Sequence, residues 1–165
     1  MKIGIMGTHG AGKTTYAGEL AAKLRKRFPD SSVGVLHEIA RTCPFSLNKK
    51  SSVEAQMWLY HSQVAAEIEM ADKYDILVCD RTVLDTVVYG HHAGFGEFVG
   101  EYLYTALSHL DTYDFLYWMQ AAFKPVDDGF RDPDPAFQDA IDSIFTEWIN
   151  DYGINVKKAV IGQHA

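Results

Sequence analysis

The stretch that decides the fold of this 165-residue chain runs Gly7-Thr8-His9-Gly10-Ala11-Gly12-Lys13-Thr14. It matches the pattern G-x-x-x-x-G-K-[ST], in which a loop between a strand and a helix wraps around phosphate groups. Glycines let the backbone turn so that its amides point at phosphate oxygens, and the N-terminus of the following helix favours an anion. We therefore expect residues 7–14, together with Thr15, to bind the triphosphate of ATP. Lys13 would bridge the β- and γ-phosphates, and the Thr14 hydroxyl would ligate Mg²⁺.

The segments on both sides of this loop fit the pattern. Residues Lys2 to Met6 read as a short buried strand. The helix predicted from about Gly12 to Arg27 carries apolar side chains four residues apart on one face, namely Tyr16, Leu20 and Leu24. Phe28-Pro29 ends this helix, because proline disfavours the helical conformation in the residue before it.

Strands and helices alternate along the rest of the chain. We predict further strands at residues 32–37, 75–80, 113–119 and 154–160, and helices that begin near residues 53 and 135. Glycines at 90, 94, 96 and 100 interrupt the helical stretch between the third and fourth strands. This alternation predicts an α/β three-layer sandwich with a parallel sheet, forming a single domain over residues 1–165. A polar loop at about 122–133 is predicted to be a mobile lid.

The helix that begins near Val53 has two faces of different character. Ser51 and Glu54 fit a capping box at its start. An apolar stripe predicts the buried face and consists of Val53, Met57, Val64, Ile68 and Ala71. A polar flank of the same helix carries Gln56, Tyr60, Gln63 and Glu67. This flank is either a solvated polar surface or the wall that grips an acceptor base, since an amide can donate and accept at once.

Composition limits the partners of the chain. The net charge of −7 argues against a general nucleic-acid binder, because such proteins neutralise phosphates with Lys and Arg. Cys43 and Cys79 have no metal or redox spacing, which favours reduced thiols and a cytoplasmic location. The chain shows no signal peptide and no apolar run long enough for a membrane span, so we expect no membrane partner. A homodimer is left open.

Charged residues follow the predicted strands at their carboxyl ends, where ligands bind in open α/β sheets. Asp80 would hold Mg²⁺, and Arg81 and Arg131 would clamp the transferring phosphate with paired donors. Glu38 would orient an acceptor hydroxyl and take its proton, with Arg41 pairing with Glu38 or contacting an acceptor phosphate. These groups are those that phosphoryl transfer needs, since it depends on positioning and on neutralised charge.

Each of these residues also has a purely structural interpretation. Glu38 and Arg41 could form a surface ion pair, which stabilises little. Asp80 could be a residue of the turn that ends its strand, and Arg131 a solvated loop cation. Asp85 fits a substrate contact and a helix-capping charge equally well.

At these residues the chain resembles P-loop kinases. Asp80-Arg81-Thr82 is similar to the deoxynucleoside and nucleoside-monophosphate kinases. A further resemblance is to the kinase domain of bifunctional nicotinamide-riboside kinases and their stand-alone ATPase/kinase relatives. It is carried by Glu38-Ile-Ala-Arg41, the helix with Gln63, the strand at 113–116, residues 128–131 and residues 137–138. The resemblance implies a five-stranded parallel sheet in the order 2-3-1-4-5, and a glutamine and aromatic residues on the helix with Tyr60 and Gln63 as base contacts. It departs from the nicotinamide-riboside kinases at the third strand, which ends in Asp80-Arg81 instead of two spaced aspartates.

The sequence therefore predicts an ATP- and Mg²⁺-dependent kinase that phosphorylates a hydroxyl of a nucleoside or nucleotide. One alternative is a kinase acting on a hydroxylated base in DNA, against which the acidic balance argues. Another is a regulatory ATPase or GTPase switch. Guanine-selective switches carry an Asn-Lys-x-Asp segment, and Asn48-Lys49-Lys50-Ser51 lacks its aspartate.

Overall fold

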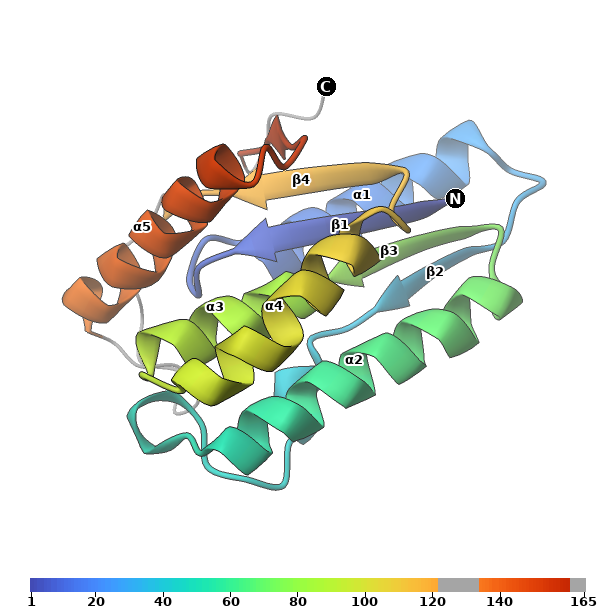
Figure 1. The fold of residues 1–165 in the computed structure, drawn as a ribbon. Helices are drawn as coiled ribbons and strands as arrows, with labels where there is room; N and C mark the ends of the chain where they lie inside the picture. The colour runs from blue at the N-terminus through green and yellow to red at the C-terminus, as the bar shows by residue number, and fades with distance from the viewer. Residues whose placement is uncertain (122–133, 161–165) are drawn as a thin grey trace.

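The computed structural model describes residues 1–121 and 134–160, and a five-stranded parallel sheet forms its centre (Figure 1). The strands are β1 (Lys2–Gly7), β2 (Val33–Leu36), β3 (Ile76–Asp80), β4 (Phe115–Met119) and β5 (Lys157–Lys158). They lie in the order β2-β3-β1-β4-β5, and all four neighbouring pairs are parallel. The predicted fold class and strand order are confirmed. The predicted lid and Arg131 lie outside the described residues.

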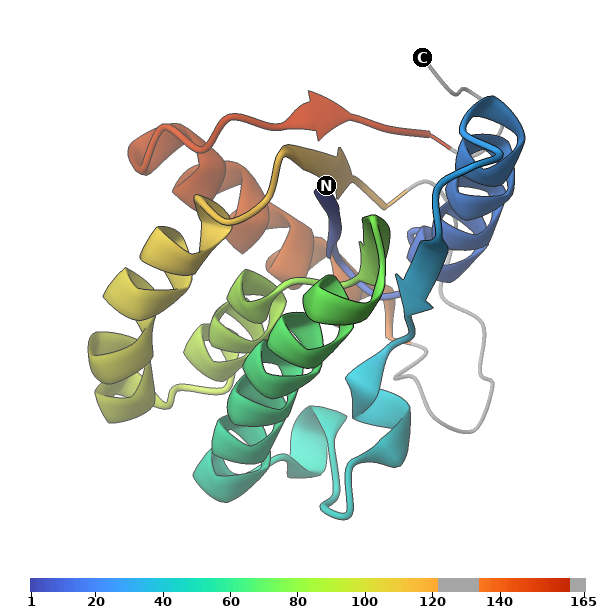
Figure 2. The same cartoon turned by 90° about the vertical axis from the view of Figure 1, so that its right-hand side faces the viewer.

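Helices cover the two faces of the sheet unequally. The helices are α1 (Lys13–Arg27), α2 (Val53–Lys73), α3 (Val83–His92), α4 (Gly96–Leu110) and α5 (Pro135–Asp151), with short 3₁₀ turns η1 (Ile39–Thr42) and η2 (Asn48–Lys50). Figure 2 shows α1 on one side of the sheet and the other four helices on the opposite side. Tyr16 and Ala17 of α1 pack with Ile5 on the first side, and Val87 and Phe145 pack with Leu77 on the second. The three layers predicted from the sequence are therefore present.

The predicted boundaries fail where local signals are weak. The last strand spans only Lys157–Lys158, whereas a strand was expected over 154–160. Ile154 and Val156 instead pack against the larger core without joining the sheet. The glycine-rich stretch resolves into α3 and α4, with Gly94 between them at φ +79°, a conformation that L side chains rarely adopt.

The orientation of α2 contradicts two expectations. Its N-cap is Ser52, whose hydroxyl accepts from the Ala55 amide at 3.3 Å, so the predicted cap at Ser51 is wrong by one residue. The predicted apolar stripe is also wrong, because Met57 and Ile68 are exposed. The buried face is the polar flank instead and consists of Ala55, Gln56, Tyr60, Gln63 and Glu67. Burial of this face is favourable because Glu67 contacts Lys2 of β1 and His109 of α4, and Gln63 donates to the carbonyl of Arg81.

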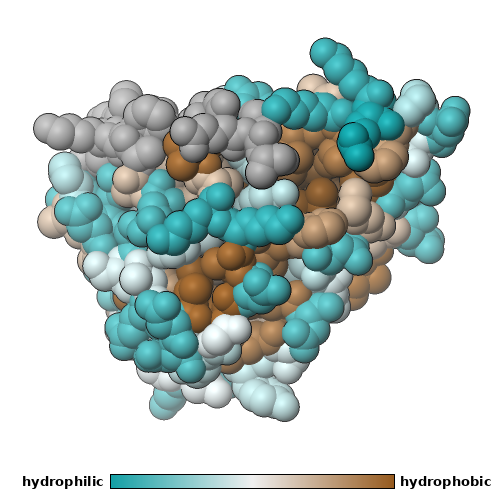
Figure 3. Space-filling model, turned by 90° about the horizontal axis from the view of Figure 1, so that it is seen from above, coloured by the Kyte–Doolittle hydropathy of each residue, from teal (hydrophilic) through white to brown (hydrophobic). Residues whose placement is uncertain are grey.

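The sheet edge at β5 exposes apolar surface. Phe115, Tyr152 and Val160 are 40%, 48% and 47% exposed. Figure 3, which views the molecule from above, shows apolar side chains at the surface among polar ones.

Within residues 1–121 and 134–160, no helix has both the length and the hydropathy that crossing a bilayer demands.

Candidate active site

The loop between β1 and α1 depends on glycine for its shape. Gly7, Gly10 and Gly12 have φ of +140°, +71° and +87°. A Cβ atom on Gly7 would lie 2.1 Å from the carbonyl oxygen of Met119, so no larger residue fits beside β4. The loop thus turns into the N-terminus of α1, and the binding of a phosphate there stays a prediction.

Lys13 is the buried lysine of this loop. Its Nζ donates to the carbonyl oxygens of Gly7 at 2.7 Å and Thr8 at 2.6 Å. Burial, and then the charge of Arg81, lower the pKa of Lys13 from 10.5 to about 7. An ammonium group held in this way is ready to bind an anion, because a phosphate would restore the solvation that burial removes.

Thr14 and Asp80 form a pair of oxygen donors beside the loop. The Thr14 hydroxyl donates to Asp80 Oδ2 at 2.6 Å, and Asp80 ends β3 in a buried position. Mg²⁺ prefers oxygen ligands and keeps several waters, so a hydroxyl, a carboxylate and substrate phosphates suit it. No cluster of three His, Cys, Asp or Glu side chains that could hold a metal occurs among the described residues. Thr14 and Asp80 would fit a Mg²⁺ ion that is bound together with a nucleotide.

Tyr89 and Gln138, two residues outside the motif, hold the loop by hydrogen bonds. The Tyr89 hydroxyl accepts from the His9 amide at 3.0 Å and lies 2.9 Å from His9 Nδ1. Gln138 of α5 donates from Nε2 to the backbone carbonyl of His9 at 2.8 Å. The backbone carbonyl of Gln138 accepts from the Thr8 hydroxyl at 3.2 Å. Residues 137–138 carry part of the family resemblance, but no sequence pattern indicates that Tyr89 or Gln138 contacts the loop, because both lie on helices far along the chain.

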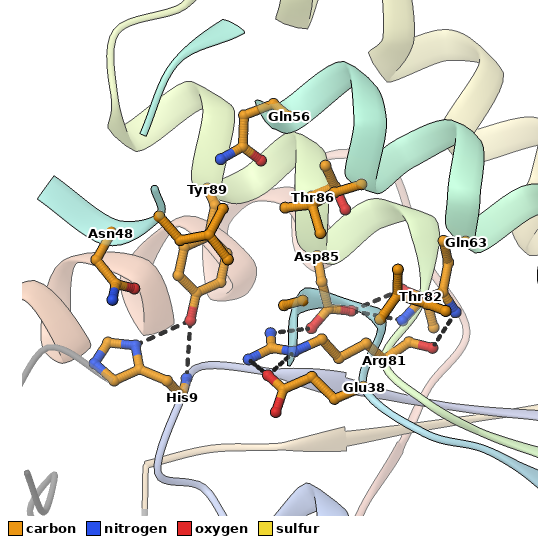
Figure 4. A pocket seen from close by; sticks show the side chains of 14 residues that line it. His9, Glu38, Asn48, Gln56, Gln63, Arg81, Thr82, Asp85, Thr86 and Tyr89 are labelled. Atoms are coloured by element: carbon orange, nitrogen blue, oxygen red, sulfur yellow. Dashed lines mark hydrogen bonds and ion pairs between the residues drawn. The ribbon is translucent and has the colours of Figure 1, made fainter. Parts of the chain in front are cut away.

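A cavity lies next to the loop, between α2, α3 and the segment after β2 (Figure 4). About 630 Å³ of space lies between its lining atoms, and part of this space is open solvent. Its lining comprises His9, Glu38, Ile39, Ala40, Leu47, Asn48, Gln56, Leu59, Gln63, Arg81, Thr82, Asp85, Thr86 and Tyr89. We call it the acceptor cavity.

Arg81 lies between the carboxyl groups of Glu38 and Asp85 (Figure 4). Its Nε and Nη2 donate to Glu38 Oε1 at 2.7 and 2.6 Å, and its Nη1 lies 3.3 Å from Asp85 Oδ1. The backbone of Arg81 has φ +101°, which is unusual for a residue with a side chain. The guanidinium carbon also lies 5.5 Å from the centroid of the Tyr89 ring.

Glu38 and Arg81 connect the two parts of the site. Both line the acceptor cavity, and both also line a smaller cavity formed with Gly10, Gly12, Lys13, Thr14, Thr15 and Asp80. The phosphate loop and the acceptor cavity are therefore adjacent, with one carboxylate and one guanidinium group at their junction.

The remaining predicted residues take different positions. Asp85 has the predicted capping role, because its Oδ2 accepts from the Thr82 amide at 2.9 Å in a capping box. It also lines the acceptor cavity, and its contact with a substrate stays a prediction. Burial raises the pKa of Asp85, although the charges of Arg81 and Lys13 oppose this. The side chain of Arg41 is 47% exposed and lies 3.2 Å from Glu38 Oε2, outside the lining of the acceptor cavity.

Tyr60 does not occupy the place that was predicted for it. It is buried in the core, with its ring centroid 4.7 Å from that of Tyr102, and it does not line the acceptor cavity. The neighbouring Leu59 lines the cavity instead, together with Gln56 and Gln63. The prediction of Tyr60 as a substrate contact is therefore wrong in this structure, because α2 is rotated about its axis relative to the expected orientation.

Comparison with solved structures supports the kinase-like fold. The deoxyadenosine kinase from M. mycoides with bound dATP is 18% identical, with a TM-score of 0.70, over 100% of this chain and 93% of that one. Thymidylate kinase from Ehrlichia chaffeensis is 19% identical, with a TM-score of 0.65, over 100% and 89%. The NadR protein in complex with NAD and AMP-PNP is 14% identical, with a TM-score of 0.69, over 98% of this chain but 44% of that one.

At sequence level the assignment rests on a family model. A search of the curated proteins finds none with significant similarity to this chain. The model of the AAA domain, however, matches residues 2–164 and thus nearly the whole sequence. With its phosphate loop, its parallel sheet and this match, the chain belongs to the AAA domain family and has the fold of P-loop nucleoside and nucleotide kinases.

Proposed function

We propose that this protein is a kinase that uses ATP and Mg²⁺ to phosphorylate a hydroxyl group of a nucleoside or nucleotide. The observation that carries this proposal is the junction of two cavities at Glu38 and Arg81. A hydrolytic switch needs a nucleotide site alone, whereas a kinase needs a second site for the acceptor beside the γ-phosphate. The similarity in fold to nucleoside and nucleotide kinases supports the same conclusion.

On the donor side, the phosphate loop would hold the triphosphate. Lys13 would turn from the carbonyls of Gly7 and Thr8 to the β- and γ-phosphates. Thr14 and Asp80 would hold Mg²⁺, which neutralises charge on the phosphate oxygens. These groups position the γ-phosphate toward the junction of the two cavities.

On the acceptor side, Glu38 is the proposed base. The acceptor hydroxyl oxygen forms a bond to the γ-phosphorus, the bond from that phosphorus to the β–γ bridging oxygen breaks, and ADP leaves. The hydroxyl proton passes to the Glu38 carboxylate, and Arg81 stabilises the charge on the transferring group. Glu38 is 5% exposed, so its proton transfer would occur away from bulk water.

The charges around the acceptor cavity favour an uncharged nucleoside over a nucleotide. Within the described lining, the carboxyl groups of Glu38 and Asp85 flank the single guanidinium group of Arg81. An acceptor phosphate placed there would face two carboxyl groups and compete with them for that guanidinium group. A neutral sugar hydroxyl meets no such opposition.

A screen with radiolabelled ATP tests the proposal. Nucleosides, deoxynucleosides, their monophosphates and nicotinamide riboside would each be offered as acceptors. We expect transfer to nucleosides, its loss in Lys13→Ala, and a lower turnover in Glu38→Gln with unchanged ATP affinity. Glu101→Gln, which replaces an exposed carboxylate on α4, is the matched control and should leave the transfer unchanged. If ATP·Mg²⁺ binds but no acceptor is phosphorylated, the proposed function is wrong.

A further inference from the structure

The carboxyl group of Asp85 contacts the phosphate loop, the start of α3 and the guanidinium group of Arg81 at the same time. Its Oδ1 accepts from the Gly7 amide at 3.3 Å and from Arg81 Nη1 at 3.3 Å. Its Oδ2 accepts from the Thr82 amide and from the Thr82 hydroxyl, each at 2.9 Å. Figure 4 shows the contacts with Arg81 and Thr82. Because Gly7 ends β1, this one side chain links two segments that are 78 residues apart in sequence.

These four contacts use the hydrogen-bonding capacity of the Asp85 carboxylate. A carboxylate offers about four lone-pair sites, and each of its partners here is an N–H or O–H group that donates. Asp85 is 2% exposed, so water has little access to it. A substrate hydroxyl group could therefore bind Asp85 only by displacing one of these donors.

Asp85 and Glu38 hold the guanidinium group of Arg81 from two sides. Nε and Nη2 of Arg81 donate to Glu38 Oε1 at 2.7 and 2.6 Å, and Nη1 donates to Asp85 Oδ1. A guanidinium group is planar and its N–H groups form a rigid fork, so contacts at two of its edges fix both its position and its plane. With Glu38 alone, the group could still swing about that contact.

The same oxygen of Asp85 relates this guanidinium group to the phosphate loop. Oδ1 accepts from both Gly7 and Arg81, so a single atom lies between the loop backbone and the guanidinium group. Gly7 is paired with Met119 of β4 in the sheet, which fixes one end of this connection. The guanidinium group thus has a defined distance from the loop that would hold the γ-phosphate.

We propose that Asp85 is a positioning residue, which holds the Arg81 guanidinium group at a fixed place relative to the phosphate loop so that it can stabilise the phosphate group in transfer. The inference rests on the proposed function of the site. It assigns Asp85 a role through Arg81 in place of a contact with the substrate. A misplacement of about 1 Å in the groups around a reaction can lower the rate by about 100-fold, so loss of this contact should appear in kcat.

Asp85→Asn tests the proposal, because an amide has one oxygen where the carboxylate has two. Its nitrogen must face either Thr82 or the N–H groups of Gly7 and Arg81, which can only donate. The contacts with Thr82 are the shorter ones, so we expect the amide oxygen to keep them and the cap of α3 to remain. With ATP·Mg²⁺ and the most active nucleoside, kcat should fall by about 10- to 100-fold, and the acceptor KM should change by less than about threefold. Glu97→Gln, which replaces an exposed carboxylate in the first turn of α4, is the matched control and should leave both unchanged.

The kinetic outcomes separate this proposal from its alternatives. A rise in the acceptor KM with an unchanged kcat in Asp85→Asn would indicate a substrate contact and overturn the positioning role. No transfer by the unmodified protein to any acceptor would refute the kinase function, and the inference with it.

A double-mutant cycle with Arg81 distinguishes positioning from a general loss of structure. In Arg81→Met the guanidinium group is absent, so Asp85→Asn should lower kcat by less than about threefold in that background. Equal reductions in the two backgrounds would contradict a role through Arg81. Thermal unfolding would verify that each variant is folded.

The fixed guanidinium group is also measurable without turnover, by ¹⁵N NMR of the unmodified protein. Restricted rotation should give separate signals for Nη1 and Nη2 of Arg81, which are assigned by their loss in Arg81→Met. These signals should broaden or merge in Asp85→Asn. A single averaged signal in the unmodified protein would overturn the proposal even if the protein is a kinase.

Discussion

Lys13 should take up a proton when ATP binds. The pKa of this buried ammonium group is lowered from 10.5 to about 7, chiefly by burial and then by the charge of Arg81. At about pH 8 roughly a tenth of the Lys13 side chains would therefore be protonated in the free protein. A triphosphate beside Nζ supplies the opposite charge and raises this pKa again, so the bound protein should hold about 0.9 proton more.

The lowered pKa of Lys13 also makes the free energy of unfolding depend on pH. Between about pH 7 and 10.5 the unfolded chain binds more protons at Lys13 than the folded protein does. The contribution of this residue to the free energy of unfolding thus rises with pH across that window, by roughly 5 kcal/mol over its full width. Bound ATP removes this dependence, because it restores the charged form in the folded state.

Calorimetry measures the proton uptake. ATP·Mg²⁺ would be titrated into the protein at about pH 8 in buffers of different ionisation enthalpy, and the slope of the heat against that enthalpy gives the number of protons. Lys13→Met should bind more weakly and show no uptake. Lys23→Met, on the outer part of α1, should retain the uptake of the unmodified protein. A heat of binding that is independent of the buffer, or a net release of protons, would refute the inference that Lys13 is mostly deprotonated at about pH 8 until ATP binds.

Three further changes probe the site and its scaffold. Asp80→Asn removes the carboxylate beside the Thr14 hydroxyl and should weaken ATP binding in the presence of Mg²⁺ on the order of 10- to 100-fold. Calorimetry should show little effect of this substitution on ATP binding when a chelator removes Mg²⁺. Tyr89→Phe removes the acceptor of the His9 amide and should cost roughly 1–3 kcal/mol in urea unfolding, while an unchanged midpoint would contradict that role. Gly18→Ala meets nothing within 4 Å on the exposed side of α1 and should raise the free energy of unfolding by about 0.5–1 kcal/mol.

The features that the sequence predicts well are those set by short stretches of chain. The phosphate loop needs glycines and a lysine at fixed spacing, so it can be identified from the sequence alone. Glu38, Asp80 and Arg81 follow from the rule that ligands bind at the carboxyl ends of parallel strands. Arg131 stays a prediction, because it lies beyond the described residues.

The orientation of α2 could not be predicted from its own residues. Its apolar stripe indicates one buried face, yet the helix buries Glu67 and Gln63 instead. Lys2 of β1, and His109 and Tyr113 from the end of α4 and the start of β4, supply the partners that make this burial favourable. Such partners are distant in sequence, so a periodicity argument confined to α2 cannot include them. The misplacement of Tyr60 follows from this single error.

The same polar network explains how an unfavourable backbone conformation is maintained at the junction of the two cavities. Arg81 has a positive φ, which costs free energy and persists only where the surrounding structure imposes it. Its amide donates to the Ile5 carbonyl at 3.0 Å, and its own carbonyl accepts from Gln63, whose amide is oriented by Glu67. With the backbone held from both sides, the guanidinium group is fixed against Glu38 at the place where the γ-phosphate and the acceptor hydroxyl would meet. The buried face of α2 therefore connects the shape of the acceptor cavity to the position of the guanidinium group that the proposed phosphoryl transfer would use.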